Sequence, residues 1–317
     1  MGKSTIVRWS DPKVILVATN LIEGQTLILH AIYQASLSRA SVLLVHVIRP
    51  SDLKTDAPNG VPAFVPIPAE REIKTELDET TKEFQSAGIL CEPIVLTGNP
   101  AEQISQLVKL RTVDRVIVAT RYASGVARLL KPSVAEELIA ILDVPVCVVG
   151  RRAHLPPACG KPFGRILLAM SLHSRSPLLA RFASTLAELN QSQLTVLHVL
   201  EAQGLFEQER ELARLSAHRK LCSLISNETS HRHPPTLVVR EGDPASIILE
   251  ETRSLPQDVL ILGSPNPLMV SRFLTNSVVH RVVVESQCPV ITIGGGSVTS
   301  AEERRESAVA ELMSNHS

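Results

Sequence analysis

Residues 119–149 read ATRYASGVARLLKPSVAEELIAILDVPVCVV, and residues 263–293 read GSPNPLMVSRFLTNSVVHRVVVESQCPVITI. Each stretch begins as an apolar run ends, crosses an irregular loop, resumes at a serine and closes on a Pro-Val strand. Ser133 and Ser277 hold the same place in the two copies, 144 residues apart. Solenoid repeats have periods of about 20–50 residues, so a repeat of this length indicates a duplicated domain.

The rest of the chain divides into the same two halves. Gly98-Asn99-Pro100 recurs as Gly242-Asp243-Pro244, and in each the polar residue suits a helix cap and the proline suits the first helical position. A chain of 317 residues also fits two domains of about 150 residues. We therefore expect domains over residues 1–150 and 164–296, a Pro-rich linker over 151–163 and a polar tail over 297–317.

Short apolar runs alternate with stretches of helical periodicity in both halves. Val14–Ala18 is a continuous apolar run, which is typical of a strand buried on both faces of a parallel sheet. Gln25–Ser38 has apolar residues at a helical period. This alternation predicts an α/β fold of two tandem open, doubly wound parallel sheets. Residues 50–68 hold five prolines and an Asn-Gly pair, so we expect no regular structure there.

The composition argues against several functional classes. Thirty-two basic side chains balance thirty-two acidic ones, which gives no argument for nucleic acid or an anionic membrane surface. No apolar run approaches the ~20 residues of a transmembrane helix, and the N-terminus lacks the apolar segment of a signal peptide. We therefore expect a cytoplasmic protein that binds no nucleic acid and does not insert into a membrane.

Chemistry-bearing clusters are also missing from the sequence. The five cysteines form no CxxC pair, and three of them (Cys91, Cys147 and Cys288) lie in or beside apolar runs as small hydrophobes. His231-Arg-His233 has no cysteine or carboxylate ligand nearby, which favours a surface loop over a metal site. No activated nucleophile is recognisable, so we expect no metal and no enzymatic activity.

These pieces together resemble a tandem universal stress protein, with two such domains in one chain. The matching pieces are the strand endings LLVHV (43–47) and TVLHV (195–199), the segments GNPAEQI (98–104) and GDPASII (242–248), and the two stretches quoted first. The resemblance implies a five-stranded, Rossmann-like sheet of the adenine-nucleotide α-hydrolase type in each domain. It also implies that the two domains pair internally, and it leaves a further homodimer open.

Members of that family that bind ATP carry Gly-x-x-Gly, nine residues, Gly-Ser or Gly-Thr, and an Asp after the first strand. Glycines let backbone N–H groups approach the phosphates, and the helix N-terminus adds partial positive charge. In the first half, the glycine positions hold Ala119, Tyr122 and Pro132, Ser133 is retained, and Asn20 replaces the Asp. In the second half they hold Gly263, Asn266 and Asn276, Ser277 is retained, and Ser171 replaces the Asp.

The second copy of this pattern is the less damaged one. Pro132 has no N–H to offer and Tyr122 is bulky, whereas asparagine tolerates positive φ. The candidate nucleotide-binding positions are Gly263, Ser264, Asn266, Asn276, Ser277, Ser171, Ala119, Ser133 and Asn20.

Each retained position also has a purely structural interpretation. Ser133 with Glu136 forms a capping-box pattern, Ser277 is a plain N-cap, and Gly263 could simply end a strand. Two hypotheses follow. The first is a non-enzymatic stress-response or regulatory module that acts through an unidentified protein partner and holds no cofactor. The alternative is an ATP-binding switch that uses the second domain.

Overall fold

The computed structural model describes most of the chain outside the two irregular loops. The described residues are 3–21, 24–49, 54–55, 63–64, 67–120, 133–158, 160–172, 176–201, 204, 206–226, 234–263 and 277–294. Several of the sequence-predicted positions lie outside these ranges: Tyr122, Pro132, His231, His233, Ser264, Asn266 and Asn276.

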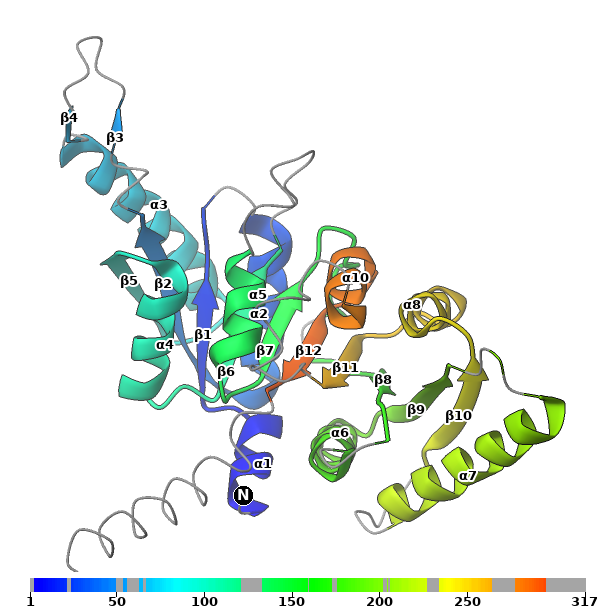
Figure 1. The fold of residues 1–317 in the computed structure, drawn as a ribbon. Coiled ribbons are helices and arrows are strands. Elements are labelled where there is room, and N and C mark those ends of the chain that lie inside the picture. The colour runs from blue at the N-terminus through cyan, green and yellow to red at the C-terminus, as the bar shows by residue number, and fades with distance from the viewer. Residues whose placement is uncertain are drawn as a thin grey trace, which may run out of the picture.

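The first half consists of a leading helix followed by alternating strands and helices (Figure 1). In chain order these are α1 (Lys3–Ser10), β1 (Val14–Ala18), α2 (Gly24–Ser38), β2 (Ser41–Ile48), β3 (Lys54–Thr55), β4 (Ala63–Phe64), α3 (Ile67–Ser86), β5 (Cys91–Thr97), α4 (Pro100–Leu110), β6 (Arg115–Ala119), α5 (Val134–Ile141) and β7 (Val146–Val149).

The second half repeats this order, but its described residues include no leading helix and no counterpart of β3 and β4. Its elements are β8 (Arg165–Ala169), α6 (Ser176–Asn190), β9 (Gln193–Leu200), α7 (Glu207–Ser226), β10 (Thr236–Glu241), α8 (Pro244–Ser254), β11 (Val259–Gly263), α10 (Val278–Glu285) and β12 (Val290–Ile293). Asn99 and Asp243 cap α4 and α8 with their side chains, and a proline follows each cap, as the sequence predicts.

The expectation that residues 50–68 hold no regular structure is wrong. β3 and β4 form a short antiparallel pair, and α3 begins at Ile67. The prolines fall outside the paired positions, so the strand residues keep the N–H groups that pairing needs. Pro68 lies in the first turn of α3, where its missing N–H has no intrahelical partner to lose.

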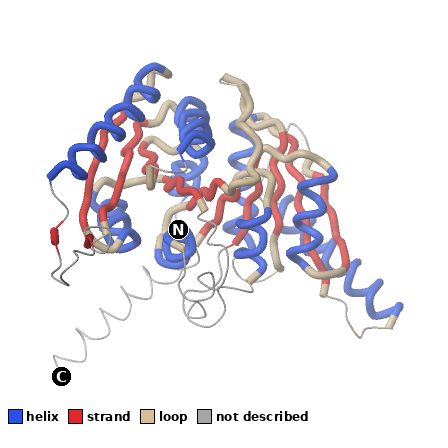
Figure 2. The backbone as a smooth tube through the Cα atoms, turned by 90° about the horizontal axis from the view of Figure 1, so that it is seen from above, coloured by secondary structure: helices blue, strands red, loops and turns tan. Residues whose placement is uncertain are grey.

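The two five-stranded sheets join into one ten-stranded sheet, which confirms the expected internal pairing (Figure 2). The strand order is β10-β9-β8-β11-β12-β7-β6-β1-β2-β5, and its neighbouring strands pair in parallel except for β12 and β7, which are antiparallel. At that junction Cys147 faces Ile291. These two residues are equivalent in the two copies, so a pseudo-two-fold axis passes between them.

Each face of this sheet carries one apolar core that runs through both halves. Alternate strand residues point to opposite faces, so Ile15 and Val17 join one core and Leu16 joins the other. The first core includes residues of α1, α2, α3, α6 and α7. The second core includes residues of α4, α5, α8 and α10. The halves therefore share their cores in addition to their sheet.

The segments before β1 and β8 each reach the opposite half. α1 lies at the amino ends of the strands and packs on α6, and Ser10 Oγ donates to the Phe182 carbonyl at 3.4 Å (Figure 1). In the other direction, the Phe163 ring meets the Tyr33 ring of α2 edge-on, with centroids 5.3 Å apart. His30 Nε2 donates to the His154 carbonyl at 2.8 Å. These reciprocal contacts tie the two halves together.

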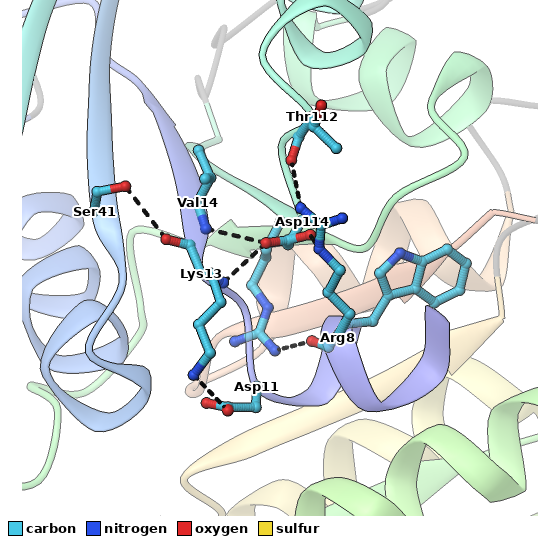
Figure 3. A network of polar contacts seen from close by, with 9 residues as sticks. Arg8, Asp11, Lys13, Val14, Ser41, Thr112 and Asp114 are labelled. Carbon is cyan, nitrogen blue, oxygen red and sulfur yellow. Dashed lines mark hydrogen bonds and ion pairs between the residues drawn. The ribbon is translucent and has the colours of Figure 1, made fainter. Parts of the chain in front are cut away.

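A buried carboxylate fixes the start of the first central strand (Figure 3). Asp114 Oδ2 accepts from the backbone N–H groups of Lys13 at 2.8 Å and Val14 at 3.0 Å. Its Oδ1 pairs with Arg8 Nε of α1 at 2.5 Å. The equivalent Asp258 accepts from the backbone N–H groups of residues 164 and 165. The first half thus adds a contact that fixes α1 in place.

Arg115 provides a second anchor for α1 from inside the sheet. Its guanidinium is fully buried and donates to the Trp9 carbonyl at 2.7 Å and to Gln34 Oε1 at 3.0 Å. The Gln34 amide in turn donates to Cys147 Sγ at 3.2 Å. Burial lowers the pKa of Arg115 to about 10, so the side chain is still charged at neutral pH. This network connects α1, α2 and the strands next to the pseudo-two-fold axis.

Candidate functional site

The candidate sites lie where the strand order reverses in each half. The reversal falls between β1 and β6 in the first half and between β8 and β11 in the second. Open α/β sheets bind ligands at the carboxyl ends of such strands. Since Ala18 pairs with Val118, the structure brings Asn20 next to the end of β6, where Ala119 lies. Ser171 likewise lies near Gly263.

The two serines cap helices at the far ends of the loops. Ser133 Oγ accepts from the Glu136 N–H at 3.3 Å, and the Glu136 carboxylate accepts from the Ser133 N–H at 2.7 Å. Ser277 Oγ accepts from the His280 N–H at 3.1 Å. The predicted capping box and the plain N-cap are both confirmed. Each serine hydroxyl therefore caps its own helix. This role explains the presence of the serine without a bound ligand.

Gly263 has a packing role as the last residue of β11. A Cβ at this position would lie 3.0 Å from Leu179 Cδ1 of α6, which is too close for an undistorted contact. The equivalent residue of the first half is Ala119, which has a Cβ. It lies next to α2, whose sequence differs from that of α6. The packing of α6 against β11 therefore also favours the glycine that looks like a remnant of a phosphate loop, because a larger residue would make the Leu179 side chain shift.

The positions after the first strand of each half carry no charge. Asn20 and Ser171 hold the two positions where the family resemblance implies an Asp for ATP binding. The Ser171 carbonyl accepts from Ser176 Oγ at 2.6 Å, so this residue helps to begin α6. Neither side chain can supply the anionic acceptor for a nucleotide's hydroxyl groups.

The equivalent histidines of the second strands bind the backbone beside these positions. His46 Nδ1 donates to the Thr19 carbonyl at 3.1 Å, and His198 Nδ1 donates to the Met170 carbonyl at 2.9 Å. Both are therefore hydrogen-bonded strand histidines. Because Nδ1 carries the proton, the neutral ring leaves Nε2 as an acceptor. Each histidine thus fixes the backbone turn that presents Asn20 or Ser171.

Sequence reasoning missed a contact between the two candidate sites. His280 Nδ1 of α10 pairs with Glu136 Oε1 of α5, and both side chains are nearly buried, with exposed fractions of 10% and 13%. The two residues are 144 positions apart and so hold equivalent places in the two copies. Burial acts to raise the pKa of Glu136, but the bonds from His280 and Ser133 and the charge of His280 together lower it. The repeat offset was the signal that could have found this pair.

The lowered pKa of Glu136 predicts a specific pH dependence of stability. A carboxyl whose folded pKa lies below its unfolded value stabilises the fold above the unfolded pKa, here about 4.5, and stops doing so as pH falls through the folded pKa. We expect wild type to be more stable than Glu136→Gln at pH 7 and the difference to shrink below about pH 4.5. Urea unfolding of both proteins at pH 7, 5 and 4 measures it. A difference that grows as pH falls from 5 to 4 would contradict the assignment.

The described residues contain no cluster of three or more His, Cys, Asp or Glu side chains arranged to hold a metal ion. Nor does any helix within the described ranges have the length and apolarity required to cross a membrane.

Comparison with known proteins places these features in a family. The model of the universal stress protein family matches residues 12–150 and 162–294. Universal stress protein YxiE of Bacillus subtilis is 25% identical over 127 residues, which cover 38% of this chain and 85% of that protein.

Solved structures share the whole two-half architecture. A universal stress protein from Archaeoglobus fulgidus has a TM-score of 0.68 at 19% identity, covering 90% of this chain and 97% of its own. Protein PA1789 of Pseudomonas aeruginosa has a TM-score of 0.62 at 13% identity, covering 95% and 99%. At these identities the similarity shows the fold alone.

Proposed function

The chain belongs to the universal stress protein family, and from that premise we propose that it is a non-enzymatic stress-response module acting through association with another protein. In this proposal both nucleotide loops are degenerate and no cofactor is needed. We also propose domains over residues 1–150 and 164–296, joined by the linker 151–163 and followed by a tail over 297–317. We propose further that it is cytoplasmic. The balanced charge supports a protein that does not bind nucleic acid.

One observation carries the proposal: the residue two positions after the first strand of each half is not a carboxylate. A ligand that is buried on binding needs a hydrogen-bond partner for each of its donors and acceptors. Each donor or acceptor left without a partner weakens binding by about 1–3 kcal/mol. Asn20 and Ser171 supply no anionic acceptor in either half. The structural roles of Ser133, Ser277 and Gly263 further remove the need for a ligand to explain the residues that remain.

The direct test is calorimetric titration of the purified chain with ATP and Mg²⁺. We expect no saturable binding with a Kd below about 1 mM, which corresponds to about −4 kcal/mol. Mass spectrometry of the small molecules released on denaturing freshly purified protein is the companion measurement. ATP released in near-stoichiometric amount would overturn the proposal.

The second candidate is an ATP-binding switch in the second half, supported by Gly263 and Ser277 at the family's positions. Gly263→Val is a poor probe because its side chain would collide with Leu179. Ser277→Asp is better, since aspartate caps a helix as well as serine but places a negative charge where phosphate would bind. If the switch exists, ATP raises the melting temperature of wild type and of the matched control Ser133→Asp, but not of Ser277→Asp. An equal response in all three would exclude a second-half site.

A further inference from the structure

Next to the pseudo-two-fold axis, the interface between the halves is built from equivalent residues that face each other. Cys147 faces Ile291 in the sheet, and Glu136 faces His280 between the helices beside it. If one half paired with a copy of itself in the same geometry, each of these residues would meet its own kind. The residues next to the axis therefore influence whether a half pairs with the other half or with a copy of itself.

The strands at this axis and the glycines that follow them do not discriminate between like and unlike pairs. The paired strand positions of β7 and β12 are uncharged in both halves, and the Thr292 hydroxyl donates to the Val146 carbonyl. Gly150 and Gly294 follow the two strands and lie against the end of the other half's helix, near the carbonyls of Val283 and Leu142. This arrangement is nearly symmetric. Apolar strands and small residues would fit a like pair as well as an unlike one.

Glu136 and His280 break that symmetry. We propose that they form a recognition pair that makes the first half select the second half, and not a copy of itself, as its partner. A like pair of first halves would oppose two nearly buried carboxylates, and a like pair of second halves would oppose two imidazoles. Coulomb interactions grow as the surroundings lose water, so a mismatch at sites only 10–13% exposed costs more than one on the surface.

The duplication also provides a matched rescue variant. Glu136 has two tasks, since one carboxylate oxygen binds His280 and the other completes the capping box with Ser133. In the double variant Glu136→His/His280→Glu, the new glutamate follows Ser277 at the same spacing. It can complete a capping box there and face the new histidine. The variant thus transfers both contacts to the opposite halves.

The test compares four full-length chains: wild type, Glu136→His, His280→Glu and the double variant. Hydrogen exchange of the amides in β7 and β12 reports on the junction, and β1 and β2 serve as the internal control. We expect exchange at the junction to speed up about tenfold in His280→Glu, the factor that corresponds to about 1.4 kcal/mol. The double variant should return to within about threefold of wild type.

Glu136→Gln covers the case in which His280→Glu unfolds altogether. Glutamine still suits the capping box but carries no charge, so we expect junction exchange between that of wild type and that of Glu136→His. Junction exchange that is the same in all variants would overturn the proposal. So would a double variant whose loss equals the sum of the two single losses, because the residues would then act independently.

Discussion

Replacing Trp9 by alanine is expected to lower the free energy of unfolding by about 3–5 kcal/mol, the usual loss for a buried aromatic side chain. Trp9 is only 4% exposed, and it belongs to the same apolar core as Phe182 of α6 in the second half. The substitution leaves the Trp9 carbonyl in place, so the bond from Arg115 can persist. The loss therefore measures the packing of α1 across the two halves.

Val7→Ala is the matched control for this prediction. Val7 lies on the same helix but is 51% exposed, so its truncation should change stability by no more than about 0.5 kcal/mol. Urea unfolding monitored by circular dichroism measures both variants. If Trp9→Ala cost as little as Val7→Ala, α1 would not be an integral part of the core.

Replacing Asp114 by alanine is expected to cost about 3 kcal/mol. The change removes the acceptor for the N–H groups of Lys13 and Val14 at the partly buried start of β1, and it also removes the partner of Arg8. Bonds to a charged acceptor contribute more than neutral ones, and buried donors left without a partner add their desolvation cost. Asp114→Asn should lose about half as much, because its carbonyl oxygen can still accept.

Asp258→Ala is the internal comparison, since Asp258 holds the same place before β11. Its bonds to the N–H groups of residues 164 and 165 lie in a more exposed setting, where water can replace the carboxylate. We expect a loss of about 1 kcal/mol. Equal losses for the two aspartates would show that the contact with α1 adds nothing to the role of Asp114.

Local sequence patterns predicted many of the strands and helix ends of this protein. The buried strands, the caps at Asn99 and Asp243 and the capping box at Ser133 each depend on residues close together in the chain. The 144-residue repeat then predicted two similar halves, and the family resemblance supplied their internal pairing. The short strands β3 and β4 escaped prediction because proline content was read for the whole segment, whereas only the paired positions need free N–H groups.

Contacts between distant segments could not be read in this way. Arg115 begins an apolar strand and gave no sign that it would be buried against the Trp9 carbonyl and Gln34. α1 precedes the first strand by sequence but packs on a helix of the second half. Such contacts depend on which surfaces the folded sheet brings together, and no local pattern encodes that.

The duplicated stretch shows the division between the two sources of information. By itself, the sequence determined that residues 119–149 and 263–293 are copies, that each resumes at a helix-capping serine, and that the glycine pattern for phosphate is incomplete. The tertiary structure alone decided that Gly263 packs against Leu179 and that Glu136 meets His280. The reason is physical: caps and periodicity arise within one turn or strand. The Gly263 contact arises only when α6 folds onto β11, and the Glu136 contact arises only when antiparallel pairing of β7 and β12 brings the two copies together.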